Sequence, residues 1–140
     1  MIDKQAMGKK SRRKGKSFEL EIRKDLESKG WIVCRWGNQV EDGKLISARA
    51  KYNPFRKVMS MSTGFPDFIA YRKFQCIECY SPCSWEVIGV ECKMGKYLDK
   101  IEKEKVLWLL NNEIFKYILI AYKKNRGILY EEHLKGGNEK

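Results

Sequence analysis

Histidine is almost absent from this chain. The 140 residues contain one, His133, which lies close to the C-terminus. Active sites built on paired histidines, or on a histidine base with nearby partners, are therefore not expected. The sequence also lacks the glycine-rich loop with which P-loop proteins hold phosphate groups, and this excludes that class of nucleotide-binding protein.

Long apolar runs are absent as well. No stretch has the length and hydrophobicity needed to cross a bilayer, so no membrane partner is expected. The N-terminus is charged and has no apolar centre, which is not the pattern of a secretory signal. We therefore expect a cytoplasmic protein, and its length fits one domain with a single core.

Acidic residues are scarce relative to basic ones. Asp and Glu number 18 against 29 Lys and Arg, which gives a net charge of +11. Such an excess favours a polyanionic partner, most often a nucleic acid, although a solvated basic surface has the same composition. Residues 1–16 are especially basic, and we expect a flexible arm that lies along phosphates or is only a solubilising tail. Its candidate phosphate-binding residues are Lys9, Lys10, Arg12, Arg13, Lys14 and Lys16.

The five cysteines are an odd number in a chain without a secretory pattern, which does not fit a secreted disulfide scaffold. Cys76, Cys79 and Cys83 are clustered, and the first two have the spacing of a zinc knuckle. A structural zinc site needs four ligands, so His133 or a cysteine of another chain would have to complete it. One disulfide or free thiols are the alternatives.

A first helix is predicted after the arm. Ser17 suits an N-cap, and Phe18, Ile22 and Leu26 recur at the spacing of one helix face. Gly30 suits the position just after a helix end.

The remaining pattern alternates strands with one further helix. Strands are expected at 31–36, 67–71, 85–92, 117–122 and 127–130, and the second helix at 101–115. Insertions are expected at about 38–63, as a hairpin or a long loop, and at about 74–84, with a fraying tail at 134–140. The order α-β-β-β-α-β-β over residues 17–133 predicts one α/β domain with a mixed central sheet flanked by helices. Cys34 and Cys92 fall in apolar strand runs and are expected to be buried.

Three residues near two predicted strands carry the strongest chemical signal. Asp67 follows Gly64-Phe65-Pro66, and Glu91-Cys92-Lys93 ends the next strand. Glu91 and Lys93 are two positions apart, so they project from the same strand face. Carboxylate oxygens suit Mg²⁺, and a lysine beside that ion can orient water or stabilise charge on a phosphate.

This arrangement resembles the signature of the PD-(D/E)xK nuclease superfamily, in which Pro-Asp is followed by apolar-Glu-x-Lys. Two further segments resemble the archaeal Holliday junction resolvases within it, and VRR-NUC domains are a second, related resemblance. The segments are Lys14-Gly15-Lys16-Ser17-Phe18-Glu19 and Trp31-Ile32-Val33-Cys34-Arg35. The resemblance implies a restriction-endonuclease-like fold.

The resemblance also implies roles for individual residues. Asp67 and Glu91 would hold Mg²⁺, or Mn²⁺ as a substitute, with the Cys92 main-chain carbonyl and with Glu19 from the first helix. Lys93 would position the attacking water. Arg35 would contact the scissile phosphate or an adjacent one.

A metal-dependent endodeoxyribonuclease that resolves four-way DNA junctions is therefore expected. The alternatives are a flap, restriction-like or repair nuclease, or a DNA-binding module without catalysis. Two cuts on opposing strands imply a homodimer. Trp108, with Val106, Leu109 or Phe115, is the candidate dimer patch, unless the long insertion or the first helix covers that face.

Overall fold

The computed structural model of the protein describes residues 4–48, 50–61, 64–74 and 84–136. These residues form two helices and nine strands. The predicted cysteine cluster at Cys76, Cys79 and Cys83 lies outside them. Within the described ranges, no helix combines the length and the apolar character needed to cross a membrane.

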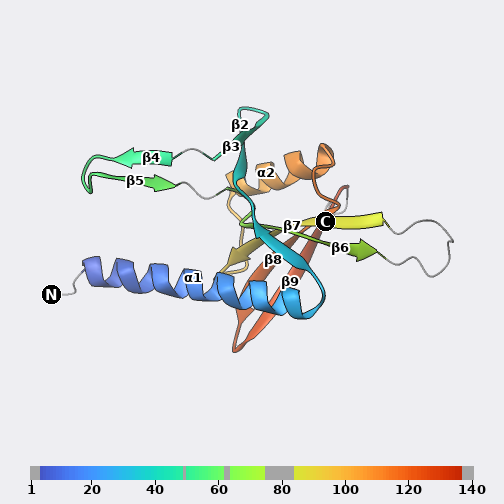
Figure 1. The fold of residues 1–140 in the computed structure, drawn as a ribbon, viewed down its shortest axis with the longest axis horizontal. Helices are drawn as coiled ribbons and strands as arrows, with labels where there is room; N and C mark the ends of the chain where they lie inside the picture. The colour runs from blue at the N-terminus through green and yellow to red at the C-terminus, as the bar shows by residue number, and fades with distance from the viewer. Residues whose placement is uncertain (1–3, 49, 62–63, 75–83, 137–140) are drawn as a thin grey trace.

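A five-stranded mixed sheet forms the centre of the molecule, in the order β1-β6-β7-β8-β9 (Figure 1). Its strands are β1 (Ile32–Arg35), β6 (Phe68–Phe74), β7 (Ser84–Lys93), β8 (Tyr117–Lys124) and β9 (Gly127–Leu134). Only β7 and β8 pair in parallel, and α2 (Lys100–Asn111) makes the crossover that this pairing requires. The predicted α/β class with a mixed sheet and two helices is confirmed.

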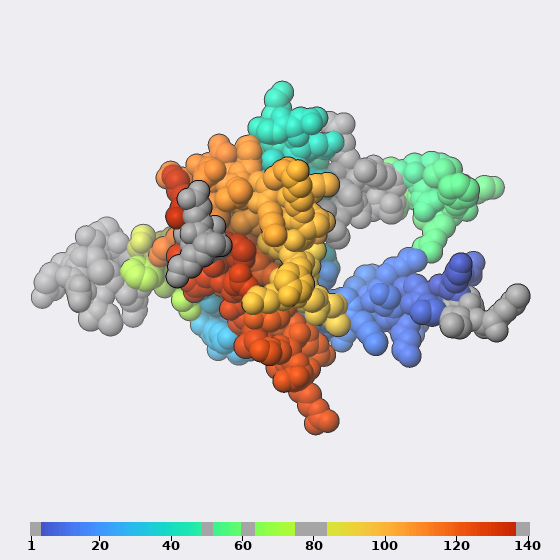
Figure 2. Space-filling model, turned by 180° about the vertical axis from the view of Figure 1, so that it is seen from behind, coloured from blue at the N-terminus to red at the C-terminus, as the bar shows by residue number. Residues whose placement is uncertain are grey.

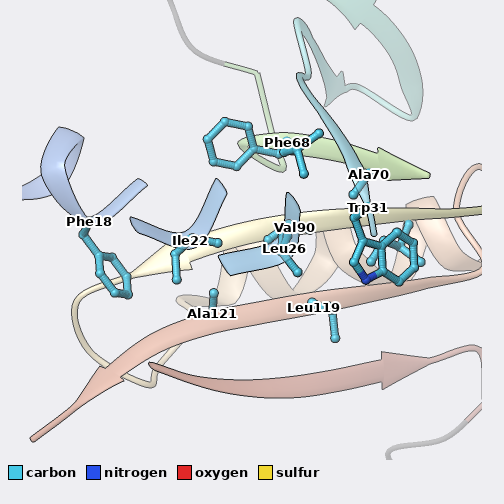
Figure 3. Packing of buried hydrophobic residues seen from close by; sticks show 11 residues of the cluster. Phe18, Ile22, Leu26, Trp31, Phe68, Ala70, Val90, Leu119 and Ala121 are labelled. Atoms are coloured by element: carbon cyan, nitrogen blue, oxygen red, sulfur yellow. The ribbon is translucent and has the colours of Figure 1, made fainter. Parts of the chain in front are cut away.

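The two faces of the sheet carry separate apolar clusters. On one face, Phe18, Ile22 and Leu26 of α1 (Lys4–Ser28) point toward Val90, Ala121 and other sheet residues (Figure 3). On the other face, Leu109 and Leu110 of α2 pack with Ile118 and Ile120 of β8. The periodicity that predicted the first helix therefore also marked the face that it buries.

Residues 4–16 are not the flexible arm that the sequence suggested. They are the first half of α1, one continuous helix of 25 residues that passes through Ser17 (Figure 1). Lys, Arg, Gln, Met and Ala favour helix, and the cost of Gly8 and Gly15 is too small to end it. No side chain of this half is buried.

The stretch at 38–63 forms two antiparallel hairpins within its described residues. The first pairs β2 (Asn38–Glu41) with β3 (Lys44–Ser47), and the second pairs β4 (Ala50–Asn53) with β5 (Val58–Met61). Asp42 and Gly43 both have positive φ, as the two-residue Asp-Gly turn between β2 and β3 requires. Residues 4–16 and the β4–β5 hairpin extend away from the sheet on the same side, and together they are called the projecting region (Figure 1).

The expected dimer patch on the second helix is wrong for three of its four residues. Val106, Leu109 and Phe115 are buried inside the chain, and Trp108 and Val40 of β2 each pack against the same cluster. Trp108 and Val40 also line a cleft of about 970 Å³ between α2 and the β2–β3 hairpin. The insertion therefore covers this side of the helix in part, as the alternative expected. A homodimer itself stays a prediction.

One expected buried cysteine is exposed. Cys34 lies on β1, where only Val33 of the four strand residues is buried, because β1 is the edge strand. Cys92 is partly buried against the α1 side of the core.

Candidate active site

The candidate site lies where β6 begins and β7 ends. The β6–β7 ladder has its last pair at Phe68 and Val90, whereas β7 continues to Lys93 beside β8 alone. Asp67, one residue before β6, therefore stands opposite Glu91. The Asp67 N–H donates to Glu91 Oε2 at 3.1 Å, and the Cys92 N–H donates to Asp67 Oδ2 at 2.9 Å. These reciprocal hydrogen bonds fix both carboxylates against the main chain.

Gly64 sets the path of the chain into Asp67. A Cβ at this position would lie 2.3 Å from the Trp36 carbonyl oxygen and 2.5 Å from that of Asn38, so only glycine fits. The Phe65 N–H donates to the Asn38 carbonyl at 2.9 Å, and the Trp36 N–H donates to the Asp67 carbonyl at 3.1 Å. The glycine of the motif thus lets the segment lie directly against the end of β1.

Glu91 is buried and Asp67 is half-buried, and this sets their electrostatics. Burial is the main cause that raises the pKa of Glu91 to about 9, and the charge of Asp67 adds to it. Burial also raises the pKa of Asp67, against the hydrogen bond from the Cys92 N–H and with support from the charge of Glu19. Two touching carboxylates with little solvent are favourable only with a proton or a cation between them.

Lys93 lies between two glutamates. Its Nζ is 3.7 Å from Glu91 Oε1 and 2.5 Å from Glu102 Oε1 on α2. Burial alone would lower the pKa of Lys93, but the hydrogen bond to Glu102 and the charges of Glu91 and Glu102 raise it overall. Lys93 therefore stays an ammonium group at neutral pH.

Glu102 was not among the predicted site residues. Its N–H donates to the side chain of Asp99, the N-cap of α2, at 2.8 Å. Asp99 and Glu102 have the Asx-x-x-Glu spacing of a helix start, a signal that shows where the helix begins and not what the glutamate contacts. One oxygen of this carboxylate, Oε2, is buried and has no hydrogen-bond partner within the part of the chain that the structure describes.

Glu19 and Arg35 lie next to the carboxylate pair, on the α1 side of the sheet. The Arg35 guanidinium contacts Glu19 Oε2 at 3.1 Å and lies 5.9 Å from the Phe68 ring. The charge of Glu19 still acts on Asp67, whose pKa it helps to raise. Glu19 is therefore close to the site but is held by Arg35.

The predicted phosphate-binding residues of the first helix divide into two groups. Lys9 and Arg12 line a cleft with Arg56, and Lys10, Arg13, Lys14 and Lys16 are exposed along α1.

The Cys92 side chain stays protonated. Burial, followed by the charges of Asp67 and Glu91, raises the pKa of its thiol.

The donor set fits a small hard cation. Among the described residues, no group of three or more His, Cys, Asp or Glu side chains is arranged to hold a metal ion. Mg²⁺ commonly uses one or two carboxylates and keeps several waters, so Asp67 and Glu91 meet its needs. The N–H and C=O of one strand residue face the same neighbouring strand, so the Cys92 carbonyl is directed to the Asp67 side as a third oxygen.

Comparison with protein-family models, with curated proteins and with solved structures found no match. A function for this site is therefore inferred from its own residues. Those residues combine two opposed carboxylates with a fixed ammonium group, in a chain with a net charge of +11.

Proposed function

We propose that the protein is a Mg²⁺-dependent endodeoxyribonuclease of the PD-(D/E)xK, restriction-endonuclease-like type. The observation that carries this proposal is the meeting of Asp67 and Glu91 at the free end of β7, with Lys93 on the same strand face. With the two hairpins set aside, the elements run α1-β1-β6-β7-α2-β8-β9, which is the order expected for this fold.

The chemistry requires neutralisation of charge and an oriented water. Mg²⁺ held by Asp67 and Glu91 would lower the pKa of bound water and neutralise charge on the phosphate. The raised pKa of Lys93 makes its ammonium group a hydrogen-bond donor, so we assign it to orienting water or stabilising phosphate charge and not to accepting a proton. Glu91 and Glu102 hold that group in place from two sides.

Arg35 and Glu19 support this site from the α1 side of the sheet. Arg35 is more than half exposed, so its guanidinium can contact a phosphate without leaving a buried position. If a phosphate took Arg35, the Glu19 carboxylate would lose this partner and would be free to help Asp67 and Glu91 hold the cation.

Branched DNA, and four-way junctions first, is the substrate we propose. A panel of junction, flap, duplex and single-stranded DNA, incubated with Mg²⁺ and with EDTA, tests both the activity and the substrate. We expect Mg²⁺-dependent cleavage with the junction cut fastest. Preferred cutting of flaps or duplexes would instead favour a repair or restriction-like nuclease of the same fold.

One observation favours a DNA-binding module without catalysis. Most of the hydrogen-bonding capacity seen at the site is used within the chain, since main-chain N–H groups meet Asp67 and Glu91, and Lys93 meets one oxygen of Glu102. Junction binding without cleavage of any substrate, at every Mg²⁺ or Mn²⁺ concentration, would establish this alternative.

Paired cuts across a junction call for two sites, and one chain offers one. We therefore extend the proposal to a two-fold homodimer. Light scattering should then give a mass of about 33 kDa, twice the 16.5 kDa of one chain. A monomer that still makes paired cuts would refute the dimer and leave the nuclease proposal intact.

A further inference from the structure

Phe55 is the most exposed large apolar side chain in the described part of the molecule. It is 96% exposed, at the tip of the β4–β5 hairpin. An aromatic ring in this position adds nothing to the core, and exposed large apolar groups often mark a binding surface.

The turn that carries Phe55 has a defined structure. Asn53 Oδ1 accepts hydrogen bonds from the N–H groups of Phe55 at 3.0 Å and of Arg56 at 3.3 Å. Lys57 completes the turn with a positive φ of 51°, and Asn53 and Val58 form the last pair of the ladder. The hairpin therefore presents an aromatic ring followed directly by two cations.

The same hairpin forms one wall of a basic cleft. The cleft has a volume of about 450 Å³ and is lined by Lys4, Gln5, Gly8, Lys9, Arg12 and Arg56. Four of these six residues are basic and none is acidic, so the charged side chains on both walls of the cleft are positive. Like charges in one cleft repel each other unless an anion lies between them.

The shape agrees with an elongated anionic ligand. The first half of α1 and the β4–β5 hairpin extend from the body side by side, with a hollow between them (Figures 1 and 2). A nucleic-acid backbone supplies a row of phosphates along such a cleft. Every base also offers a flat π-face to an aromatic ring, whatever its identity.

We propose that Phe55 stacks on an unpaired or unstacked base of a DNA strand whose phosphates lie in the cleft of the projecting region. This inference rests on the proposed function and adds to it the feature of DNA that is recognised. Base steps at a branch or gap are already partly unstacked, so inserting a ring there costs less than in continuous duplex. Phe55 would therefore favour branched DNA, while Lys9, Arg12 and Arg56 bind any DNA.

Binding measured in EDTA separates recognition from cleavage. The full chain, Phe55→Ala and Phe55→Trp are titrated against a four-way junction and a continuous duplex of the same sequence. Phe55→Ala should weaken junction binding by roughly tenfold and duplex binding by less than about twofold. Phe55→Trp should keep the preference of the wild type.

A matched control is Leu107→Ala on α2, which removes another exposed apolar side chain, 58% exposed, outside the cleft. It should change neither affinity. Phe55→Ala should melt at the wild-type temperature, because the ring has no core contacts to lose. 2-Aminopurine placed at the branch should be quenched differently by the wild type and by Phe55→Ala, as a stacked ring requires.

Equal affinities of wild type and Phe55→Ala for both DNAs, or equal losses on both, would overturn the inference. The inference would also be overturned if Phe55→Ala lost binding to vesicles of anionic phospholipid that the wild type binds, while its DNA binding stayed unchanged. The two proposals fail separately. A preference that depends on Phe55 without any cleavage would refute the nuclease and support stacking, whereas cleavage with no effect of Phe55 would do the reverse.

Discussion

The two halves of α1 belong to different kinds of structure. In the second half, Phe18, Ile22 and Leu26 are at most 3% exposed, and Glu19 lies close to the candidate active site. In the first half no side chain is buried, and three of its cations, Lys4, Lys9 and Arg12, line the basic cleft. One half of the helix is thus held by packing, and the other by helix propensity and continuity.

The difference indicates that chemistry and binding are separable in this molecule. The active-site region depends on a few buried groups at fixed distances, so single substitutions there should have large effects. The projecting region depends on many exposed charges, so the substitution of any one charge should have a small, additive effect. The predictions below test this contrast, beginning with the largest effect.

Loss of either carboxylate should abolish cleavage. Asp67→Asn or Glu91→Gln removes a ligand of the proposed Mg²⁺, so the rate should fall by more than about 100-fold, the upper range for residues that only support metal ligands. Single-turnover cleavage of a junction measures this. The control is Glu21→Gln, an exposed carboxylate of α1 that should keep full activity. Activity retained by both site variants would place the chemistry elsewhere.

Gly89 tests the packing beneath the site. A Cβ there would lie 2.8 Å from Pro66 and 3.1 Å from Phe115, so Gly89→Ala should lower the free energy of unfolding by about 1–3 kcal/mol. Urea denaturation measures the loss. In Gly127→Ala the nearest atom would be 3.8 Å away, so that variant serves as the control in the same sheet. Equal stability of the two variants would show that Gly89 has more room than the structure gives it.

The buried carboxyl pair predicts a pH dependence of stability in EDTA. The pKa of Glu91 is raised from 4.5 to about 9, so the folded chain keeps a proton that the unfolded chain releases as pH rises through that window. The free energy of unfolding should therefore fall with pH, by up to about 1.4 kcal/mol per pH unit from this group.

Glu91→Gln removes this titration and should become progressively more stable than the wild type from pH 5.5 to 8.5. Denaturant titrations of both proteins at three pH values measure the difference. A difference that stays constant with pH would mean that Glu91 is ionised in the folded chain.

The charges of the projecting region should have the smallest effect. The double variant Lys9→Ala/Arg12→Ala should weaken DNA binding and flatten the slope of log K against log salt by up to roughly 0.9 per lost contact. Lys123→Ala/Lys124→Ala, at the end of β8, removes the same charge outside the cleft and is the control. Equal slopes for both double variants would mean that charge acts without regard to position.

Residue patterns predicted the sheet and the meeting of its site residues. Apolar spacing located both helices and the strands of the central sheet, because burial of one face imposes that spacing. Pro-Asp before one strand and Glu-x-Lys at the end of the next placed the two carboxylates together. Antiparallel pairing of neighbouring strands was sufficient for this, as the register shows.

Other features depend on contacts that local patterns do not contain. The sequence gives Trp108 an apolar setting, but only the fold shows that Trp108 and Val40 of the β2–β3 hairpin pack against the same apolar cluster. Lys93 was predicted as a site residue, whereas its partner Glu102 was read only as part of a helix. Cys34 follows Val33 on the edge strand β1, so it projects from the opposite face of the sheet, and that face is exposed at this strand.

The most direct test of the central claim compares cleavage and binding in one variant. Lys93→Ala should lose Mg²⁺-dependent cleavage of a four-way junction, while its dissociation constant for that junction in EDTA stays within about threefold of the wild type. Lys103→Ala, which removes an exposed lysine of α2, should change neither quantity. Cleavage by Lys93→Ala at the wild-type rate, at any Mg²⁺ or Mn²⁺ concentration, would contradict the assignment of this site.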